Sequence, residues 1–534
     1  MIRDVLEQSL RDALEAVGVA PPSAVALERP ARREHGDWSS NVALASAKAA
    51  GRNPRELATE LAAHLSANPP PHVERVELAG PGFVNFHLRP TWLHDVLTDV
   101  VEQGEDDYAR PDVGAGQKVN LEFVSANPTG PLHAGGGRWA AYGDALGNVL
   151  ERCGHVVTRE YYLNDRGNQM ELFAESLRAA RNSEPPPEGG YLGEYITEWA
   201  NEMPDGADPR TWGYDRVKRD LAEALGRIGV VFDVWFSEQS HVESGAVEST
   251  LQDLRAHGHV YEAEGAVWLR TTDFGDDKDR VLVRSDGEPT YLLPDIAYHC
   301  DKLARGHQRL IDVWGADHHG HVVRLKAGLQ AVGRDPDDLE IILGQLVKLL
   351  RDGVEVRLSK RAGDLVLLDD LVTAVGPDVA RLTFLLQSLD TTQTIDLAVI
   401  TSQSMDNPVF YVQMAHARIA GIARRAADVG VSRSPLEQVD LSVLTSEREL
   451  DVLRSLGELP EIVELACRER APHKVTTWVR ELAAAFHGFY HDCYVIGEGV
   501  SPELTQARLW LVESARIGLA IGLDLLGVSA PESM

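Results

Sequence analysis

Cysteine, positive charge and uninterrupted apolar sequence are all scarce in this chain of 534 residues. Four cysteines in such a length cannot form a disulfide scaffold, and none of them makes the closely spaced pairs of a structural zinc site. The 52 Lys and Arg residues stand against 82 Asp and Glu, for a formal net charge of −30. This balance excludes binding of nucleic acid through an overall basic field, but a local Arg-bearing surface for RNA stays open.

No segment has the pattern of a targeting signal or a membrane span. The N-terminus lacks the apolar stretch of a secretory signal peptide, and its apolar residues recur with the spacing of one helix face. The most apolar late stretch, residues 509–526, contains Glu513, Arg516 and Asp524, which is typical of a packed helix. We therefore expect a cytoplasmic protein without a membrane association.

The order of the expected elements divides the chain into three domains. Residues 1–90 mix helix and strand patterns and predict a small α/β domain, whereas residues 110–376 predict a parallel sheet with crossover helices. A Pro- and Gly-rich insertion is expected at about 182–270. Strand-like segments are expected to return at VLVRSDG, TYLLPDIAY, LIDVWGADH and LEIILGQLV. Residues 377–534 predict an all-α bundle, with helices at 378–389, 408–429, 447–470, 474–492 and 502–526.

The strongest local signal is the loop Ser125–Gly137, SANPTGPLHAGGG. It follows the β-rich run Val119–Val124 and precedes a helical pattern that ends near Gly154. In such a unit the N–H groups at the helix start favour phosphate, and glycines let a nucleotide approach the backbone. His133 can donate to a phosphoryl oxygen. The alternative is a tight turn in which the histidine has a structural partner.

Three further segments carry groups suited to a nucleotide or a cation. In residues 354–364 a Ser–Lys pair can bring a compact cation onto a triphosphate, or form a solvated basic turn. In TYLLPDIAYHCDK, Tyr291, Asp295 and Tyr298 share one face of a helical start, and Asp295 can bind a cationic side chain bidentately, unless it is an ordinary helix residue. In WGADHHGH the adjacent histidines lack metal-ligand spacing, so we expect a polar loop beside a nucleotide.

Taken together and in this order, these segments resemble a class I aminoacyl-tRNA synthetase, specifically the arginyl-tRNA synthetase family. EFVSANPTGPLHAGG resembles its nucleotide-binding signature and RLSKR its second, lysine-bearing signature. NPVFYVQMAHARI, the ending LLGVSAP, and the N-terminal HGDWSSNVAL and PGFVNFHL are similar to further family segments. The resemblance implies an α/β fold: a Rossmann-like parallel-sheet catalytic domain with an insertion, a small N-terminal α/β domain that contacts tRNA, and a C-terminal helical anticodon-binding bundle.

The resemblance also implies roles for individual residues. The first signature comprises Ala126, Asn127, Pro128, Thr129, Gly130, Pro131, Leu132, His133, Ala134, Gly135 and Gly136. Direct roles in catalysis are implied for His133, Ser359 and Lys360. ATP contacts are implied for Pro131, His133, Gly135, Gly136, Asp317, His318, Leu358, Ser359 and Lys360. Arginine contacts are implied for Glu122, Asn127, Tyr291, Asp295 and His319, with the Asp295 carboxylate on the guanidinium.

In one position the chain departs from the family. The first signature normally ends His–x–Gly–His, whereas here Gly136 takes the place of the second histidine. Loss of one such transition-state donor typically costs about 10²–10³ in rate. We expect another group to compensate, either Arg138 or a residue of the 317–321 loop.

The resemblance implies an arginine–tRNA ligase that uses ATP with Mg²⁺, binds L-arginine and tRNA(Arg), acts as a monomer, and has no zinc or other metal held by its own residues. Such enzymes generally need bound tRNA before they activate arginine. The first alternative is a tRNA-binding homologue with weakened catalysis, motivated by Gly136. The second is a small-molecule nucleotidyltransferase, which the long helical C-terminal region disfavours.

Overall fold

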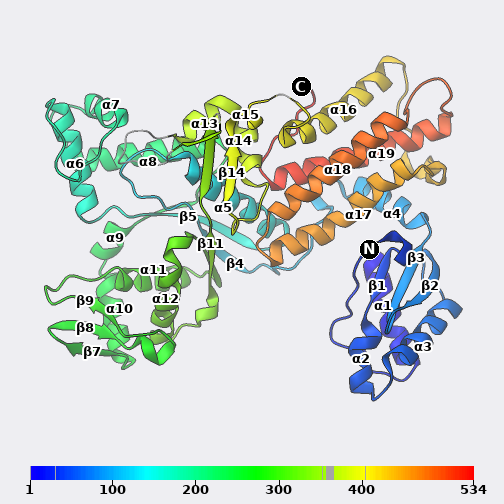
Figure 1. The fold of residues 1–534 in the computed structure, drawn as a ribbon, viewed down its shortest axis with the longest axis horizontal. Helices are drawn as coiled ribbons and strands as arrows, with labels where there is room; N and C mark the ends of the chain where they lie inside the picture. Colours follow the sequence, from blue (N-terminus) through cyan, green and yellow to red (C-terminus); the bar gives the residue numbers. More distant parts are fainter. Residues whose placement is uncertain (1, 31, 352, 357–365, 403) are drawn as a thin grey trace. The chain divides into compact units, whose positions relative to one another are not determined.

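The computed structural model describes residues 2–30, 32–351, 353–356, 366–402 and 404–534, so Leu358, Ser359 and Lys360 lie outside the described residues. The chain divides into two compact units. The first contains Met1–Gly104, Ala423–Gly457 and Ala485–Ala515, and the second contains Glu105–Ile422, Glu458–Ala484 and Arg516–Met534. Figure 1 gives the course of the chain through both units.

The N-terminal part of the first unit packs helices on a small antiparallel sheet of order β1-β3-β2. Helix α3 begins where the sequence dictates, because the Asn53 side chain caps the N–H groups of Arg55 and Glu56 and Pro54 fits the first helical position. The elements are α1 (Ile2–Ala16), η1 (Arg33–His35), β1 (Trp38–Ser40), α2 (Val42–Ala50), α3 (Pro54–Ala67), β2 (Val73–Ala79), β3 (Phe83–Leu88) and α4 (Thr91–Asp107). This confirms a small α/β arrangement at the N-terminus.

A five-stranded parallel sheet organises the second unit, with the order β11-β10-β4-β5-β6. Its strands are β4 (Lys118–Glu122), β5 (Val156–Leu163), β6 (Val234–Ser237), β10 (Arg309–Gly315) and β11 (Leu339–Gly344). The first strand, β4, lies in the middle, and the chain winds outward from it in both directions. The strand order therefore reverses between β4 and β10, which is where doubly wound sheets bind their ligands.

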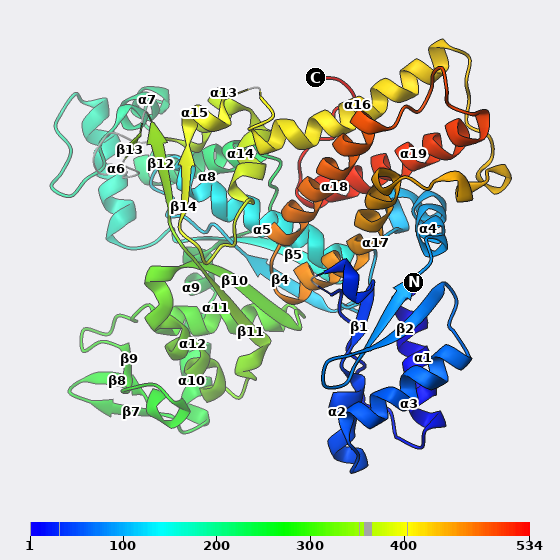
Figure 2. The same ribbon diagram turned by 45° about the vertical axis from the view of Figure 1, so that its right-hand side comes forward.

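Helices cover both faces of the parallel sheet. Figures 1 and 2 show α5 with α13 and α14 on one side and α11 with α12 on the other. These helices are α5 (Ala134–Arg152), α11 (Leu292–Ala304), α12 (His319–Ala331), α13 (Leu368–Val375) and α14 (Pro377–Phe384). Helix α5 approaches the sheet closely because it lacks side chains on that face: a Cβ on Gly143 would lie 2.2 Å from the Phe123 ring.

Further elements surround this sheet. Two small three-stranded sheets have the orders β7-β8-β9 and β13-β12-β14. Their strands are β7 (Val260–Ala263), β8 (Ala266–Leu269), β9 (Arg280–Val283), β12 (Val347–Arg351), β13 (Val354–Val356) and β14 (Gln393–Asp396). The remaining helices before residue 408 are α6 (Asn168–Arg181), α7 (Glu194–Glu202), α8 (Pro209–Arg227), α9 (Glu238–Glu243), α10 (Ala246–Ala256), η2 (Thr271–Phe274), η3 (Ala316–His318), η4 (Pro336–Asp338) and α15 (Leu397–Ile400).

Four sequence-based expectations require correction. The region 182–270 is not a single insertion, because it contains β6, which pairs in parallel with β5 as the edge strand of the main sheet. The segment TYLLPDIAY is not a strand but the start of α11. The segment VLVRSDG does supply a strand, β9, but in the small antiparallel sheet beside β8. A strand also occurs after Pro377, where none was expected: β14 pairs with β12.

The C-terminal region is helical, as expected. Its long helices are α16 (Pro408–Asp428), α17 (Glu447–Arg468), α18 (His473–Asp492) and α19 (Pro502–Leu525), with the short turns η5 (Leu436–Gln438) and η6 (Leu441–Val443) between α16 and α17. Each long helix begins and ends within two residues of its predicted range. None of the helices described is both long and apolar enough to cross a bilayer.

Candidate functional site

A pocket of about 230 Å³ opens at the point where the strand order reverses. Its lining combines carboxylates with aromatic rings, from the ends of β4 and β10, the loop after β4, β5, α11 and the start of α12. The lining residues are Glu122, Val124, Ser125, Tyr162, Asp295, Tyr298, His299, Asp312, Val313, Trp314, Gly315, His318 and His321. An acidic and aromatic pocket of this size suits a small organic cation.

The loop after β4 is strained where it enters the pocket. Val124 and Ser125 have φ angles of +68° and +39°, in the left-handed region that β-branched residues avoid. The Ser125 hydroxyl donates to Glu122 (2.9 Å) and accepts from the Tyr162 N–H (3.1 Å), and these bonds hold the strained turn in place. Strain of this kind persists only where surrounding contacts fix it, and it is common at functional sites.

Helix α11 supplies one wall of the site. Asp295, Tyr298, His299 and Lys302 recur at intervals of three, one and three residues and lie on one face of this helix. The predicted common face is thus correct for Asp295 and Tyr298. It is wrong for Tyr291, which precedes the helix, points to solvent with 76% of its surface exposed, and does not line the pocket.

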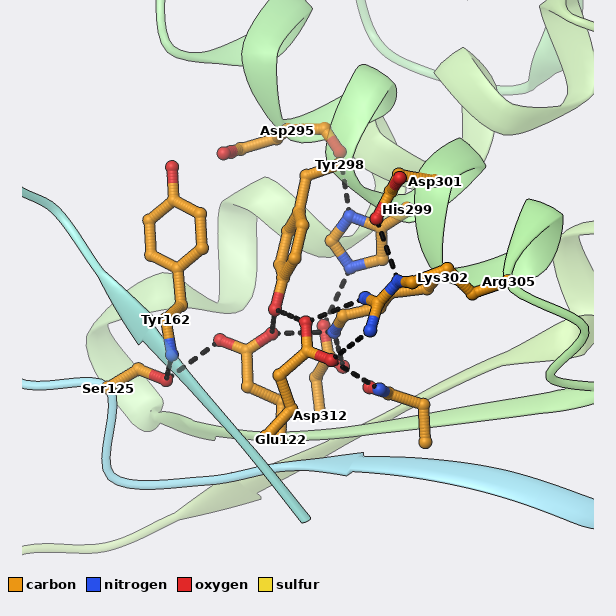
Figure 3. A network of polar contacts seen from close by, with 12 residues as sticks. Glu122, Ser125, Tyr162, Asp295, Tyr298, His299, Asp301, Lys302, Arg305 and Asp312 are labelled. Carbon is orange, nitrogen blue, oxygen red and sulfur yellow. Dashed lines mark hydrogen bonds and ion pairs between the residues drawn. The ribbon is translucent and has the colours of Figure 1, made fainter. Parts of the chain in front are cut away.

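Beneath the pocket, Lys302 joins two buried carboxylates (Figure 3). Its Nζ donates to Glu122 Oε2 (2.6 Å) and to Asp312 Oδ1 (2.9 Å). The Tyr298 hydroxyl lies 2.9 Å from Glu122 Oε2 and 2.7 Å from Glu160 Oε1, and Arg305 binds both oxygens of Glu160. Each carboxylate therefore has a cationic partner, which a buried charge requires.

His299 extends this network toward Asp295. Its Nε2 lies 2.7 Å from Asp312 Oδ2 and its Nδ1 lies 2.7 Å from the backbone oxygen of Asp295. A carbonyl oxygen only accepts, so Nδ1 carries the proton of the bond to Asp295. The carboxylates of Glu122, Glu160 and Asp312 thus meet Lys302 and Arg305, with the His299 ring on Asp312.

The electrostatics of the network follow from burial and pairing. Burial alone would lower the pKa of Lys302, but Asp312, Glu122 and Glu160 raise it above its ordinary value. Burial would likewise raise the pKa of Asp312, but Lys302 and His299 lower it to about 2. At Glu122 burial raises the pKa above its ordinary value, because the attraction of Lys302 only partly offsets it, and Asp312 adds a smaller repulsion. The ammonium of Lys302 is thus kept charged at every ordinary pH.

Asp295 and His321 form the outer wall of the pocket. His321 Nε2 lies 2.7 Å from Asp295 Oδ2, and its ring lies beside that of Trp314. Asp295 lines the pocket as predicted. His318, which was predicted to contact ATP, also lies in this lining, whereas Asp317 and His319 are exposed and outside it. His321, two positions after His319, lies beside Asp295. Asn127 is also exposed and outside the lining.

His133 begins helix α5 and caps it. Its Nδ1 accepts from the Gly136 N–H (3.1 Å), which places the proton of the neutral ring on Nε2. The backbone on both sides of His133 pairs with the chain that follows residue 365: Ala134 N–H donates to Val366 O and Leu368 N–H donates to Leu132 O (both 2.9 Å). The residues that directly follow the second, lysine-bearing signature are therefore hydrogen-bonded to the first signature.

The glycines of α5 serve packing. A Cβ on Gly136 would lie 2.5 Å from Leu132 Cδ1, and one on Gly137 would lie 2.7 Å from Leu368 Cδ1. Arg138 is not the expected substitute for the missing histidine. It is 1% exposed, and its guanidinium donates to the carbonyl oxygens of Gln345, Ser388 and Thr391 at 2.7–3.0 Å. These bonds tie α5 to the neighbouring loops and leave Arg138 turned away from solvent.

Sequence reasoning missed Lys302, Asp312 and Glu160. One signal was available for Asp312, which is a charged residue inside the otherwise apolar strand segment LIDVW. Such residues are buried only when paired. Over the residues for which the structure gives positions, no group of three or more His, Cys, Asp or Glu is arranged to hold a metal ion.

Comparison with protein families gives three matches that together span most of the chain. Residues 4–88 match the arginyl tRNA synthetase N terminal domain, and residues 412–534 match the DALR anticodon binding domain. Residues 97–187 and 214–390 match the class I (R) tRNA synthetase catalytic domain, which contains every residue of the pocket.

Solved structures of arginyl-tRNA synthetases are similar over the same range. One from Campylobacter jejuni is 33% identical, covers 84% of this chain and 100% of its own, and has a TM-score of 0.76. One from Thermus thermophilus is 23% identical with full coverage of both chains and a TM-score of 0.78. One from Plasmodium falciparum, 14% identical with 100% and 99% coverage and a TM-score of 0.75, shares the fold.

Proposed function

Because this chain belongs to the arginyl-tRNA synthetase family, a family of class I aminoacyl-tRNA ligases, we propose that it is itself an arginine–tRNA ligase. It activates L-arginine with ATP and transfers the arginyl group to the 3′ end of tRNA(Arg). The observation that carries this proposal is the acidic and aromatic pocket at the end of β4 and β10, within the family's catalytic domain.

The pocket supports arginine as the amino acid. The Asp295 carboxylate, held on one oxygen by His321, can accept two parallel N–H bonds from a planar guanidinium. Glu122 lies at the opposite, inner end and would face the α-ammonium group of the substrate. We propose Asn127 and Tyr291 as contacts that form when arginine binds, because both now point to solvent.

ATP is proposed to bind across the start of α5. The helix N-terminus favours phosphate, and His133 has its ring proton on Nε2, the nitrogen that would donate to a phosphoryl oxygen. Pro131, Gly135, Gly136, Asp317 and His318 stay proposed ATP contacts, and so do Leu358, Ser359 and Lys360. The anchoring of Val366 beside Ala134 supports a second signature that acts on the same phosphates.

The reaction has two balanced steps. A carboxylate oxygen of arginine attacks the α-phosphorus of ATP, the bond to the β-phosphate oxygen breaks, and pyrophosphate leaves. A terminal ribose hydroxyl of tRNA then attacks the acyl carbon, the bond to AMP breaks, and the hydroxyl proton is released. No protein nucleophile takes part, so the enzyme contributes positioning and electrostatic stabilisation.

Mg²⁺ would enter with ATP. It prefers oxygen ligands and is commonly held by phosphates with few protein groups. When bound, it would neutralise charge on the phosphates. The chain's own contribution there is His133 and the N–H groups that begin α5.

We propose that tRNA is contacted by the N-terminal domain, residues 1–90, and by the helical domain, residues 377–534, while residues 110–376 perform the chemistry. Arg424 and Arg425 are exposed on α16 and offer a local cationic surface despite the net charge of −30. A monomer acting in the cytoplasm, where translation supplies tRNA, completes the proposal.

The C-terminal ending is part of the catalytic domain's structure. Buried Arg381 of α14 donates to Leu526 O (2.5 Å), to Ile228 O (2.7 Å) and to Asp144 of α5. Deleting residues 400–534 would leave this guanidinium without one acceptor, so loss of activity after that deletion would not report tRNA binding alone. Substitution of Arg424 and Arg425 by Gln is the sharper test of tRNA contact.

Gly136 favours one second candidate, a homologue that binds tRNA with weakened catalysis. The experiment that separates the two functions is ATP–pyrophosphate exchange with arginine and tRNA(Arg). A ligase exchanges label in an arginine-dependent manner, whereas the weakened homologue binds tRNA and exchanges none.

A further inference from the structure

A continuous series of hydrogen bonds runs from the Glu122 carboxylate to the backbone of Asp295, and these are the two residues that we propose to hold opposite ends of arginine. From Glu122 it passes to Lys302 (2.6 Å), then to Asp312 (2.9 Å), then to His299 (2.7 Å). His299 ends it on the backbone oxygen of Asp295 (2.7 Å). Figure 3 shows these side chains between α11 and the sheet.

This series of hydrogen bonds is rigid for three physical reasons. Lys302 and Asp312 are 0% exposed and His299 is 3% exposed, so water cannot replace a broken bond. Each oxygen of Asp312 has its own partner, Lys302 or His299, and both nitrogens of His299 are engaged. Lys302 is shared by two buried carboxylates, so a movement that separates it from either would leave a buried charge without its partner.

The series of hydrogen bonds also connects three elements that border the pocket, namely β4, β10 and α11. Glu122 ends β4, Asp312 lies on β10, and Asp295 lies in the first turn of α11. Pairing of β4 with β10 puts Asp312 directly beside Glu122. The spacing between Glu122 and the first turn of α11, which carries Asp295, is therefore set by bonds within the protein.

We propose that Lys302, Asp312 and His299 are positioning residues that determine which length of cationic amino acid the site accepts. The proposal rests on the proposed function, because it assumes that Glu122 and Asp295 hold the two ends of arginine. Homoarginine has the same charges and one more methylene, so a fixed spacing cannot satisfy both of its ends at once. One methylene in a well-formed site is worth about 10–200-fold in kcat/KM.

The test compares arginine with homoarginine as substrates for charging of tRNA(Arg) by the full-length chain. Lys302→Met with Asp312→Asn removes both charges of the central pair and keeps similar side-chain volumes. We expect the ratio of kcat/KM for arginine over homoarginine to fall at least about tenfold. The KM for arginine rises, while the KM for ATP stays the same.

Two further variants keep the test decisive. Tyr298→Phe removes one bond to Glu122 and preserves the ring, so it should fold and reduce the ratio by a smaller factor, about threefold. Asp276→Asn with Arg280→Met removes a comparable pair (2.7 and 2.8 Å) on the small β7-β8-β9 sheet, outside the pocket, and should leave the ratio unchanged.

Two outcomes overturn the proposal. One is an unchanged ratio in the double variant, or in Tyr298→Phe if the double variant does not fold. The other is an equal fall for the Asp276 and Arg280 control. Failure of the proposed function gives a different result, since the unaltered chain would then charge neither amino acid.

Discussion

Leu132 and Gly136 share one space at the start of α5. The Leu132 side chain fills the position into which any side chain at residue 136 would project, with Cδ1 2.5 Å from where a Cβ would lie. Leu132 is 1% exposed and cannot turn outward without leaving its core contacts. Gly136, which stands where the first signature normally has its second histidine, thus leaves room for the Leu132 side chain.

Adding a side chain at position 136 should destabilise the protein. Gly136→Ala places a Cβ against Leu132, and overpacking of this kind costs about 1–3 kcal/mol. Thermal unfolding should show a lower Tm for Gly136→Ala. The double variant Gly136→Ala with Leu132→Ala should lose less stability than the sum of the losses in the two single variants. Strictly additive losses would show that the two residues do not compete for one space.

His133 has two separable roles, as cap of α5 and as proposed phosphate donor. His133→Asn keeps a capping acceptor, so its Tm should stay close to that of the unaltered chain, while its kcat falls about 10²–10³-fold. His133→Ala should show the same loss of kcat and an additional loss of about 1 kcal/mol of stability. Equal stability of His133→Asn and His133→Ala would show that the side chain at position 133 does not stabilise the protein by capping α5.

Asp295 should control affinity for arginine and not for ATP. Asp295→Asn removes the charge that faces the guanidinium, and hydrogen bonds to charged groups contribute about 1.5–3 kcal/mol. The KM for arginine should therefore rise roughly 10–100-fold with the KM for ATP unchanged. Asp301→Asn is the matched control. Asp301 lies on the same helix and accepts a hydrogen bond from Arg305, but it does not line the pocket. An equal rise in both variants would contradict a role specific to Asp295.

The buried network should make stability depend on acid pH through Asp312. Its pKa falls from an ordinary 3.8 to about 2, because Lys302 and His299 outweigh burial. Ionised Asp312 therefore stabilises the fold above pH about 4, and this contribution of about 2 kcal/mol is lost as the pH falls toward 2.

The Asp312→Asn variant carries an uncharged side chain at every pH, so comparing its stability with that of the unaltered protein isolates the contribution of the Asp312 charge. Chemical denaturation at pH 7, 5, 4 and 3 should give a difference in unfolding free energy between the two proteins that is constant down to about pH 4 and then narrows. A difference that stays the same down to pH 3 would show that Asp312 is not held ionised by its partners.

Elements formed by interactions between residues close in sequence could be predicted, and those that depend on distant residues could not. The four long C-terminal helices were predicted closely because their apolar period is local. TYLLPDIAY was mistaken for a strand because a short apolar run with aromatic residues fits either structure. His319 was chosen over His321 because adjacent histidines cannot be ranked without the register of α12, where two positions differ by about 200° around the axis.

The buried network was beyond reach of the sequence for a different reason. Lys302 and Glu122 are 180 residues apart in the chain, and only the pairing of β4 with β10 and the packing of α11 bring them together. Arg138 illustrates the same limit. Its position after the glycines suggested a nucleotide contact, yet carbonyl groups 207 and 253 residues away determine where its guanidinium lies.

The most direct test of the central claim is ATP–pyrophosphate exchange by the full-length chain. With ATP, Mg²⁺, tRNA(Arg) and labelled pyrophosphate, the account predicts that label enters ATP when arginine is added and not when lysine is added. Lysine carries the same charge but lacks the planar fork that Asp295 is placed to accept. Absence of arginine-dependent exchange at high enzyme concentration, with tRNA(Arg) still bound, would contradict the account and leave a tRNA-binding homologue in its place.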